Sequence, residues 1–282
     1  MFCFNCGKQL PDEARFCAYC GTNLSHLKMG GDAAQSTQNI NAVAANEEVS
    51  NVQSQGSAQN VVVPDTPEGN FILARRYELG VEGVEQNFRK AFDLYTKSAK
   101  GGYNEAQFRL ACAYENGELT LKVNEEKACD WYEEAARNGH VEAMFVLAEA
   151  YEYGYLELEE DEDEAFDYYL KAAENGHVKS QFIVAEAYDL ENLGVDEDKE
   201  EAHDWYQVAA KNGNVEAMYK LGDMYYWWSR DIADAKEDDE DEDFEVSEEE
   251  EQCLNAAKYW LKLAAENGHE HAKTMLKNYF SR

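Results

Sequence analysis

Positive charge is scarce in this chain of 282 residues, which carries 25 lysine and arginine residues against 58 aspartate and glutamate residues. The formal net charge at pH 7 is −33. A surface of that sign repels phosphate backbones and anionic lipid headgroups. We therefore expect neither nucleic acid nor a membrane as a partner, and expect basic peptides or proteins instead.

Long apolar runs are missing as well. No run of about 18 apolar residues, the length that would suggest a membrane-spanning helix, occurs in the chain. The residues from Met1 to Cys6 lack the basic start and the apolar run of a secretory signal. Seven cysteines, four of them clustered, fit a reducing compartment better than a disulfide framework. These features predict a cytoplasmic protein.

Catalytic residue sets are also missing. The sequence has no Ser/His/Asp set, no glycine-rich phosphate loop and no Walker-type lysine, so we expect no enzymatic activity and assign no catalytic residue. His140, His177 and His269 each follow an Asn-Gly pair at an expected helix end, where an imidazole would meet the terminal carbonyl groups. Three further cysteines are interpreted as buried free thiols: Cys112, Cys129 and Cys253.

Two CxxC pairs near the N-terminus are the clearest motif. Cys3 with Cys6 and Cys17 with Cys20 are each followed by a glycine. Thiolates at this spacing can point at one ion, and the glycine lets backbone N–H groups bond to the sulfurs. We predict a structural site for one zinc ion, with no open position for catalysis. Iron in a rubredoxin-like site and redox-active pairs are the alternatives, but the former needs wider spacing and the latter a βαβ context.

Residues 3–21 read CFNCGKQLPDEARFCAYCG, which resembles the short zinc-ribbon modules found at the start of many bacterial proteins. The resemblance covers residues 1–24. A segment this short cannot build a core, so the ion would supply folding free energy on the order of 10 kcal/mol. Residues 25–66 follow, rich in glutamine, asparagine, serine, alanine and glycine. That composition predicts a disordered linker.

The remaining residues repeat with a period of 37. The period is visible in Tyr77, Tyr114, Tyr151, Tyr188 and Tyr225, and in Gly102, Gly139, Gly176 and Gly213. It predicts a stack of identical units that each touch mainly their neighbours. Each unit holds two apolar patterns at helical spacing, closed by glycine, and thus predicts a helical hairpin. The second helix has an N-cap residue type at its start: Asn87, Asn124, Asp161 or Asp198.

Residues 106–140 read AQFRLACAYENG and then EEKACDWYEEAARNGH, and residues 143–177 read AMFVLAEAYEYG and then DEAFDYYLKAAENGH. This pattern resembles the Sel-1-like repeat family, relatives of the tetratricopeptide repeat. The resemblance implies an all-α solenoid of about five hairpins over residues 67–282, used as a non-catalytic adaptor in protein complexes. Some secreted members carry a disulfide in every unit and are linked to penicillin recognition. Such paired cysteines are missing from most units here, so that activity is not expected.

Acidic residues recur on one face of the first helices, at Glu149, Glu152, Glu186, Asp189 and Asp223. Like charges three residues apart disfavour a helix, so their recurrence suggests a function. We predict that this acidic ladder binds cationic segments of a protein partner on the concave face of the solenoid. The alternative is a solvated polar face in a very acidic chain.

The fifth unit is longer than the others, because Gly213 and Gly268 are 55 residues apart instead of 37. We expect the extra chain within residues 231–251, which hold 14 acidic residues and one lysine, with a second helix that begins after Ser247. The run either binds a basic partner or a cation, or is simply solvated. Trp227 and Trp228 are expected in a helix–helix core, with an exposed aromatic anchor as the alternative.

The leading hypothesis is an interaction scaffold in which the zinc ribbon is tethered to the helical stack. A second hypothesis is a regulatory adaptor whose ribbon contacts nucleic acid or a polymerase. The oligomeric state is not predicted.

Overall fold

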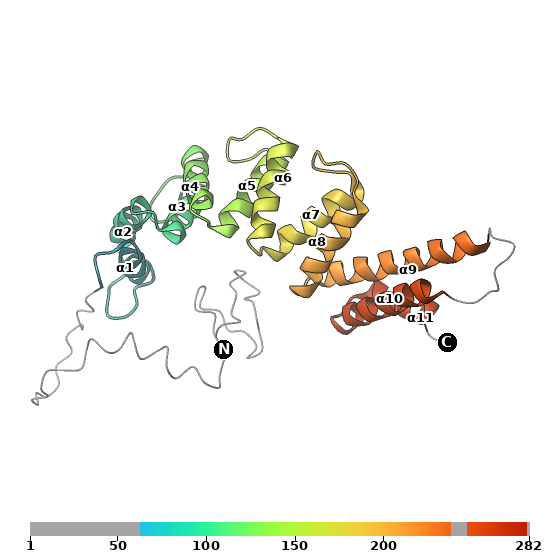
Figure 1. The fold of residues 1–282 in the computed structure, drawn as a ribbon. Helices are drawn as coiled ribbons and strands as arrows, with labels where there is room; N and C mark the ends of the chain where they lie inside the picture. The colour runs from blue at the N-terminus through green and yellow to red at the C-terminus, as the bar shows by residue number, and fades with distance from the viewer. Residues whose placement is uncertain (1–62, 238–246, 281–282) are drawn as a thin grey trace, which may run out of the picture. The chain divides into compact units, whose positions relative to one another are not determined.

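The computed structural model describes residues 63–237 and 247–280. The predicted zinc ligands, nearly all of the predicted linker and the middle of the acidic insertion lie outside these residues. Every regular element in the described part of the chain is a helix, and the eleven helices pack mainly against their neighbours in the chain (Figure 1).

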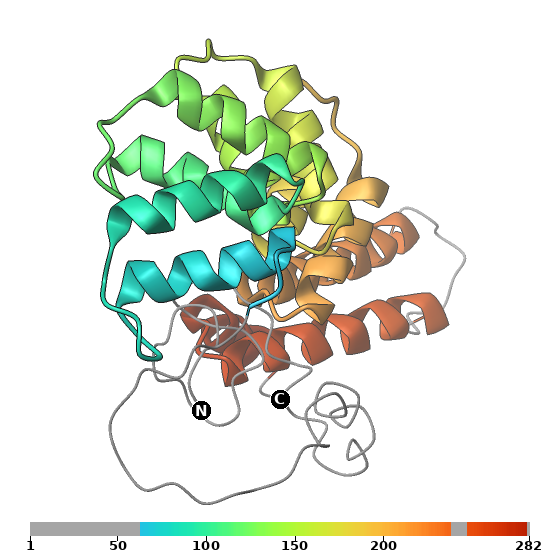
Figure 2. The ribbon, with the colours of Figure 1, turned by 90° about the vertical axis from the view of Figure 1, so that its left-hand side faces the viewer.

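The helices form a row of hairpins. They pair as α1 (Pro67–Leu79) with α2 (Phe88–Lys100), α3 (Asn104–Asn116) with α4 (Glu125–Arg137), α5 (Val141–Tyr153) with α6 (Glu162–Glu174), α7 (Val178–Leu190) with α8 (Lys199–Lys211), and α9 (Val215–Glu237) with α10 (Glu248–Glu266). Figure 2 shows α1 and α2 running side by side at the start of the row. The last helix, α11 (Glu270–Tyr279), packs against α10. The prediction of an all-α solenoid of helical hairpins is confirmed.

The ends of the helices follow from local sequence. The four predicted N-cap residues of α2, α4, α6 and α8 each accept a hydrogen bond from a backbone N–H of the first turn. Helices α3 and α5 end at Gly117 and Gly154, whose φ angles of 69° and 65° lie in the left-handed region that glycine adopts without strain. Caps of this kind set the length of the first eight helices at 13 residues.

One buried tyrosine lies at the centre of each of the first four hairpins, surrounded by buried alanines. These tyrosines come from the second helices: Tyr95, Tyr132, Tyr169 and Tyr206. Alanine allows two helices to approach closely, and the ring fills the remaining space. Burial of one such side chain contributes roughly 2–3 kcal/mol to stability.

Each of these tyrosine hydroxyls donates a hydrogen bond to a carboxylate 17 residues earlier, on the first helix of its own hairpin. The pairs are Tyr95 with Glu78, Tyr132 with Glu115, Tyr169 with Glu152, and Tyr206 with Asp189, at 2.5, 2.6, 2.5 and 3.1 Å. A buried hydroxyl without a partner would be costly. The carboxylate is therefore a structural part of the hairpin.

The fifth hairpin differs in two ways. Helix α9 has 23 residues and α10 has 19, so part of the inserted sequence within residues 231–251 extends these two helices. The predicted start of α10 is confirmed, since the Ser247 hydroxyl accepts from the Glu250 N–H. Leu261 takes the place of the buried tyrosine, and a Cβ on Gly222 would lie 2.6 Å from its Cγ. Glycine is thus required where these two helices meet.

No helix in residues 63–237 and 247–280 combines the length and the apolar character that crossing a bilayer requires.

Candidate protein-interaction face

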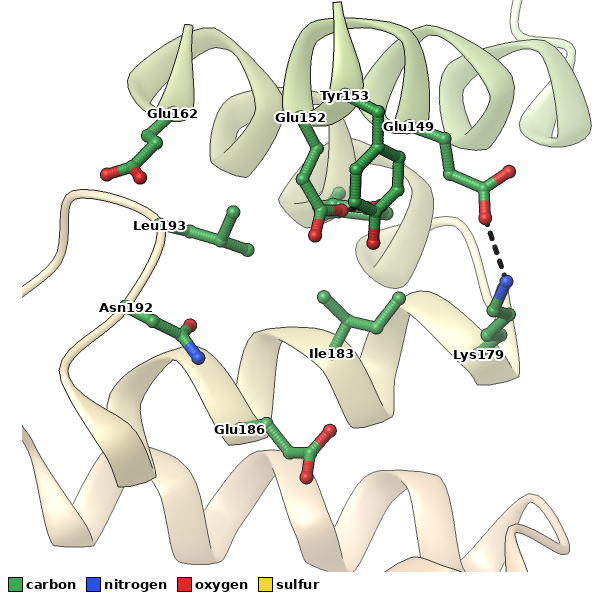
Figure 3. A pocket seen from close by; sticks show the side chains of 10 residues that line it. Glu149, Glu152, Tyr153, Glu162, Lys179, Ile183, Glu186, Asn192 and Leu193 are labelled. Carbon is green, nitrogen blue, oxygen red and sulfur yellow. Dashed lines mark hydrogen bonds and ion pairs between the residues drawn. The ribbon is translucent and has the colours of Figure 1, made fainter. Parts of the chain in front are cut away.

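A recess of about 460 Å³ opens between α5 and α7 (Figure 3). Four carboxylates, one ammonium group, an amide and several apolar or aromatic side chains line it: Glu149, Glu152, Glu162, Glu186, Lys179, Asn192, Tyr153, Tyr169, Ile183 and Leu193. The excess of carboxylates makes the recess negative, while Ile183 and Leu193 supply apolar surface. Such a lining suits a side chain with an aliphatic stem and a cationic end.

The structure brings three of the five predicted partner-binding residues to this recess: Glu149, Glu152 and Glu186. The other two, Asp189 and Asp223, lie on α7 and α9 and do not line it. The five residues of the acidic ladder therefore have different surroundings, since three of them line the recess and two do not.

Glu152 and Asp189 each accept the tyrosine hydrogen bond of their own hairpin described above, and Glu152 does so while also lining the recess. Asp189 also lies 3.0 Å from the Nζ of Lys199 and 3.6 Å from that of Lys220. Burial acts to raise the pKa of Asp189, but the hydrogen bond and charge of Lys199 bring it below its usual value. These two residues stabilise the stack, and the acidic ladder cannot be tested by replacing them.

Glu149, Glu186 and Asp223 form the remaining row, with one carboxylate on each of α5, α7 and α9. The Glu149 carboxylate lies 2.9 Å from the Nζ of Lys179 on α7, and that of Glu186 lies 3.8 Å from the Nζ of Lys220 on α9. Burial raises the pKa of Glu186 and of Asp223. Their negative charge is therefore incompletely compensated, and a further cation would stabilise it.

The three histidines that follow Asn-Gly do not meet the carbonyl groups of the preceding helix, as the sequence suggested. Each is instead the N-cap of the next helix, where its Nδ1 accepts a backbone N–H. The N···N distances are 3.1 Å for His140, 3.2 Å for His177 and 3.2 Å for His269. The prediction of a contact with terminal carbonyls is wrong, because the imidazole turns toward the free N–H groups of the following helix.

His177 gives a prediction about pH. Burial is the main cause that lowers the pKa of His177 from 6.5 to about 4, and the positive charge of Lys179 is the second. Between these two pKa values the unfolded chain binds a proton at His177 that the folded chain does not. The contribution of His177 to the free energy of unfolding therefore falls as the pH drops from 6.5 toward 4. Asn214 is the equivalent cap in the next unit and accepts from the Ala217 N–H. We expect His177→Asn to retain stability at neutral pH and to lose less on acidification.

Urea unfolding of the wild type and the variant at both ends of that pH range measures the effect. His271→Asn is the matched control, because His271 is exposed on α11. Equal pH dependence in the two variants would contradict the role of His177.

The cysteines of the described residues are free. The Cys112 sulfur lies 3.4 Å from the hydroxyl of Tyr132, and burial raises the pKa of both Cys112 and Cys129, the latter to about 11. Raised thiol pKa values oppose nucleophilic reactivity. No group of three or more His, Cys, Asp or Glu that could hold a metal occurs in residues 63–237 and 247–280.

Sequence reasoning missed an exposed apolar row next to the acidic one. Trp227, expected in a helix–helix core, is 57% exposed, whereas Trp228 is half-buried against His203 and Tyr225. Tyr153 and Leu190 hold the equivalent positions of α5 and α7 and are also exposed. The spacing of 37 residues between these three positions was a signal in the sequence that could have identified the row.

The helical repeat agrees with a known family. The Sel1 repeat model matches residues 67–103, 104–140, 141–177, 178–214, 215–232 and 254–269, which is more than half of the chain. The chain belongs to the Sel1 repeat family. Sel1 repeats are general scaffolds for protein–protein interaction. The gap between the last two matches coincides with the insertion, and the zinc-ribbon domain model matches residues 2–24.

Solved structures share the Sel1 repeat fold. A Sel1 repeat protein from Oxalobacter formigenes is 24% identical, with a TM-score of 0.54 over 77% of this chain and 80% of the other. A protective antigen with an SLR fold from uropathogenic Escherichia coli is also 24% identical, with a TM-score of 0.51 over 77% of this chain and 50% of the antigen. This chain thus spans about half of the antigen's length. A search of curated proteins returned no match.

Proposed function

We propose that this Sel1 repeat protein is a non-catalytic scaffold that binds basic segments of a protein partner on the face formed by α5, α7 and α9. In this proposal residues 1–24 form a zinc ribbon, residues 25–66 link it to the helices, and the solenoid extends over residues 67–282. The observation that carries the proposal is the recess between α5 and α7, where four carboxylates outnumber a single ammonium group.

The contacts of the acidic row support this assignment. Lys179 and Lys220 already place ammonium groups beside Glu149 and Glu186, so the row accepts lysine within the chain itself. A lysine or arginine of a partner can make the same charge-assisted contacts, with its aliphatic stem against Ile183. Burial holds the pKa of Glu186 above its usual value, and binding of a cation would relieve that unfavourable state.

The four N-terminal thiolates support the ribbon by their chemistry. Cys3, Cys6, Cys17 and Cys20 supply four soft ligands in two close pairs, the donor set that a structural zinc ion prefers. A complete set of four protein ligands leaves no position for a bound water. The zinc would therefore hold the fold of residues 1–24 and would take no part in catalysis.

The triple variant Glu149→Gln, Glu186→Gln and Asp223→Asn tests the acidic face. It leaves Glu152 and Asp189 in place, since these hold the buried tyrosines. We expect it to bind a fluorescent peptide of alternating lysine and serine about tenfold more weakly than the wild type, measured by anisotropy at physiological salt. Binding to the wild type should weaken further as salt is added.

A second acidic row provides the control. Asp93, Asp130 and Asp167 are exposed on α2, α4 and α6 and follow the same period, so their replacement by asparagine removes the same charge from the second helices. We expect this variant to bind the peptide nearly as well as the wild type. If both variants lose affinity equally, net charge alone attracts the peptide and the proposed face is wrong.

A further inference from the structure

The exposed apolar row has a regular position. It consists of Tyr153, Leu190 and Trp227, which are 63%, 57% and 57% exposed. Tyr153 and Leu190 are the last residues of α5 and α7, and Trp227 holds the same register in α9. Large apolar side chains exposed at one register on successive helices lie along one face of the stack, and exposed apolar surface of this kind can mark an interaction site.

Each member of this apolar row comes four residues after a carboxylate of the acidic row. The apolar side chain and the carboxylate are therefore neighbours on the same face of their helix. Both aromatic side chains of the row lie close to a carboxylate, Tyr153 to Glu152 and Trp227 to Asp223. The two rings therefore lie beside negative charge while remaining exposed. Aromatic side chains placed in this way are typical anchors of protein interfaces.

The combination is confined to part of the stack. In α3 the equivalent positions hold Cys112 and Asn116, and in α1 they hold Arg75 and Leu79. The buried tyrosine–carboxylate pair, by contrast, occurs in all of the first four hairpins. A feature that maintains the fold recurs in every such unit, whereas the acidic and apolar pair is limited to α5, α7 and α9. The difference indicates a binding footprint of three repeats.

We propose that α5, α7 and α9 together bind one extended segment of a partner protein in which apolar side chains recur at about every third residue with basic side chains between them. This inference rests on the proposed function and specifies its ligand. Helices bridged by a single lysine–glutamate pair lie roughly 10 Å apart, a distance that about three residues of a polyproline II segment span. That conformation makes one turn in about three residues, so every third side chain faces the same way. The segment therefore places an apolar side chain at about every third residue and basic side chains between them.

Charge selects this occupant over a second copy of the chain. The net charge of −33 makes two copies repel each other, whereas a basic segment is attracted by the carboxylates beside each apolar residue.

Two peptide probes test the inference on the full chain. One repeats Leu-Lys-Ser, and the other repeats Ser-Lys-Ser with the same charge. We expect the wild type to bind the leucine peptide about tenfold more tightly, because each buried leucine adds apolar contact area. The variant Leu190→Ser and Trp227→Ser, which leaves the lining of the recess intact, should lose most of this preference while binding the serine peptide as before.

Exposed apolar residues elsewhere supply the matched variant. Val123, Val208 and Tyr259 lie outside the row and are 59%, 38% and 60% exposed, so their replacement by serine should leave the preference for leucine intact. Unchanged circular dichroism establishes that both variants are folded.

The outcomes separate the two proposals. If the wild type binds both peptides equally, the apolar footprint is overturned. If the variant at Glu149, Glu186 and Asp223 still loses affinity in that case, the acidic scaffold remains supported. Peptide binding that is indifferent to those carboxylates overturns the scaffold proposal itself. Self-association that requires Trp227 would identify a second copy as the occupant and would likewise overturn the footprint.

Discussion

Replacement of Tyr169 by alanine is expected to destabilise the helical stack by about 3–5 kcal/mol, the usual cost of removing a fully buried ring. Tyr169 lies at the centre of the hairpin α5–α6 and donates its hydroxyl to Glu152. The substitution removes the ring from the core and leaves a half-buried carboxylate without this partner. The free energy of unfolding, measured by circular dichroism in urea, reports the effect.

Tyr153→Ala is the matched control, since it makes the same chemical change in the same hairpin at a position that is 63% exposed. Its effect should stay within about 0.5 kcal/mol, as is usual for surface positions. Because each hairpin contacts mainly its neighbours, a defect at Tyr169 should also divide the single unfolding transition into two. A small effect of Tyr169→Ala, similar to that of Tyr153→Ala, would refute the central role of the buried tyrosine.

Removal of zinc is expected to unfold residues 1–24 and to leave the helices intact. In the proposed ribbon the ion contributes folding free energy on the order of 10 kcal/mol, which a segment of that size cannot replace by apolar burial. A strong chelator, or the substitution Cys17→Ser, should abolish stoichiometric zinc, measured by elemental analysis. Amide NMR signals of residues 1–24 should then collapse to the narrow range of an unfolded peptide.

The cysteines of the helical stack provide the comparison. Cys112→Ser and Cys253→Ser remove thiols on α3 and α10 and should leave the zinc content of the chain unchanged. The helical circular dichroism signal should survive chelation, since α1–α11 lie within residues 67–279. Zinc that persists in Cys17→Ser would exclude the four-thiolate site.

Much of the fold is readable from the period of 37 residues because caps and apolar positions are local properties. Asn124 shows this well: an asparagine before an apolar stripe predicts an N-cap, and the structure has α4 beginning directly after it. The end of α9 was less predictable. No glycine or proline interrupts residues 223–237, so the helix continues to Glu237, into the segment where the sequence predicted only that the extra chain begins.

The interaction face was harder to predict because period alone does not show which way a side chain points. Glu149 and Glu152 seemed equivalent as members of an acidic ladder, and both line the recess, yet only Glu152 also accepts a hydrogen bond from a buried tyrosine. The constant separation of 17 residues between such carboxylates and a tyrosine carried that information. Trp227 was misplaced for a similar reason, since aromatic residues in a helical repeat are more often buried than exposed.

Each helix packs mainly against its neighbours in the chain, and this affects how the protein folds during synthesis. Contacts that are short in sequence cost little chain entropy to close, and proteins built from them fold quickly. Each hairpin can therefore assemble as soon as its own residues and the next first helix have left the ribosome, well before synthesis ends. The pair α9–α10, whose helices are joined through the acidic insertion and which packs against α11, is expected to form after the four hairpins that precede it.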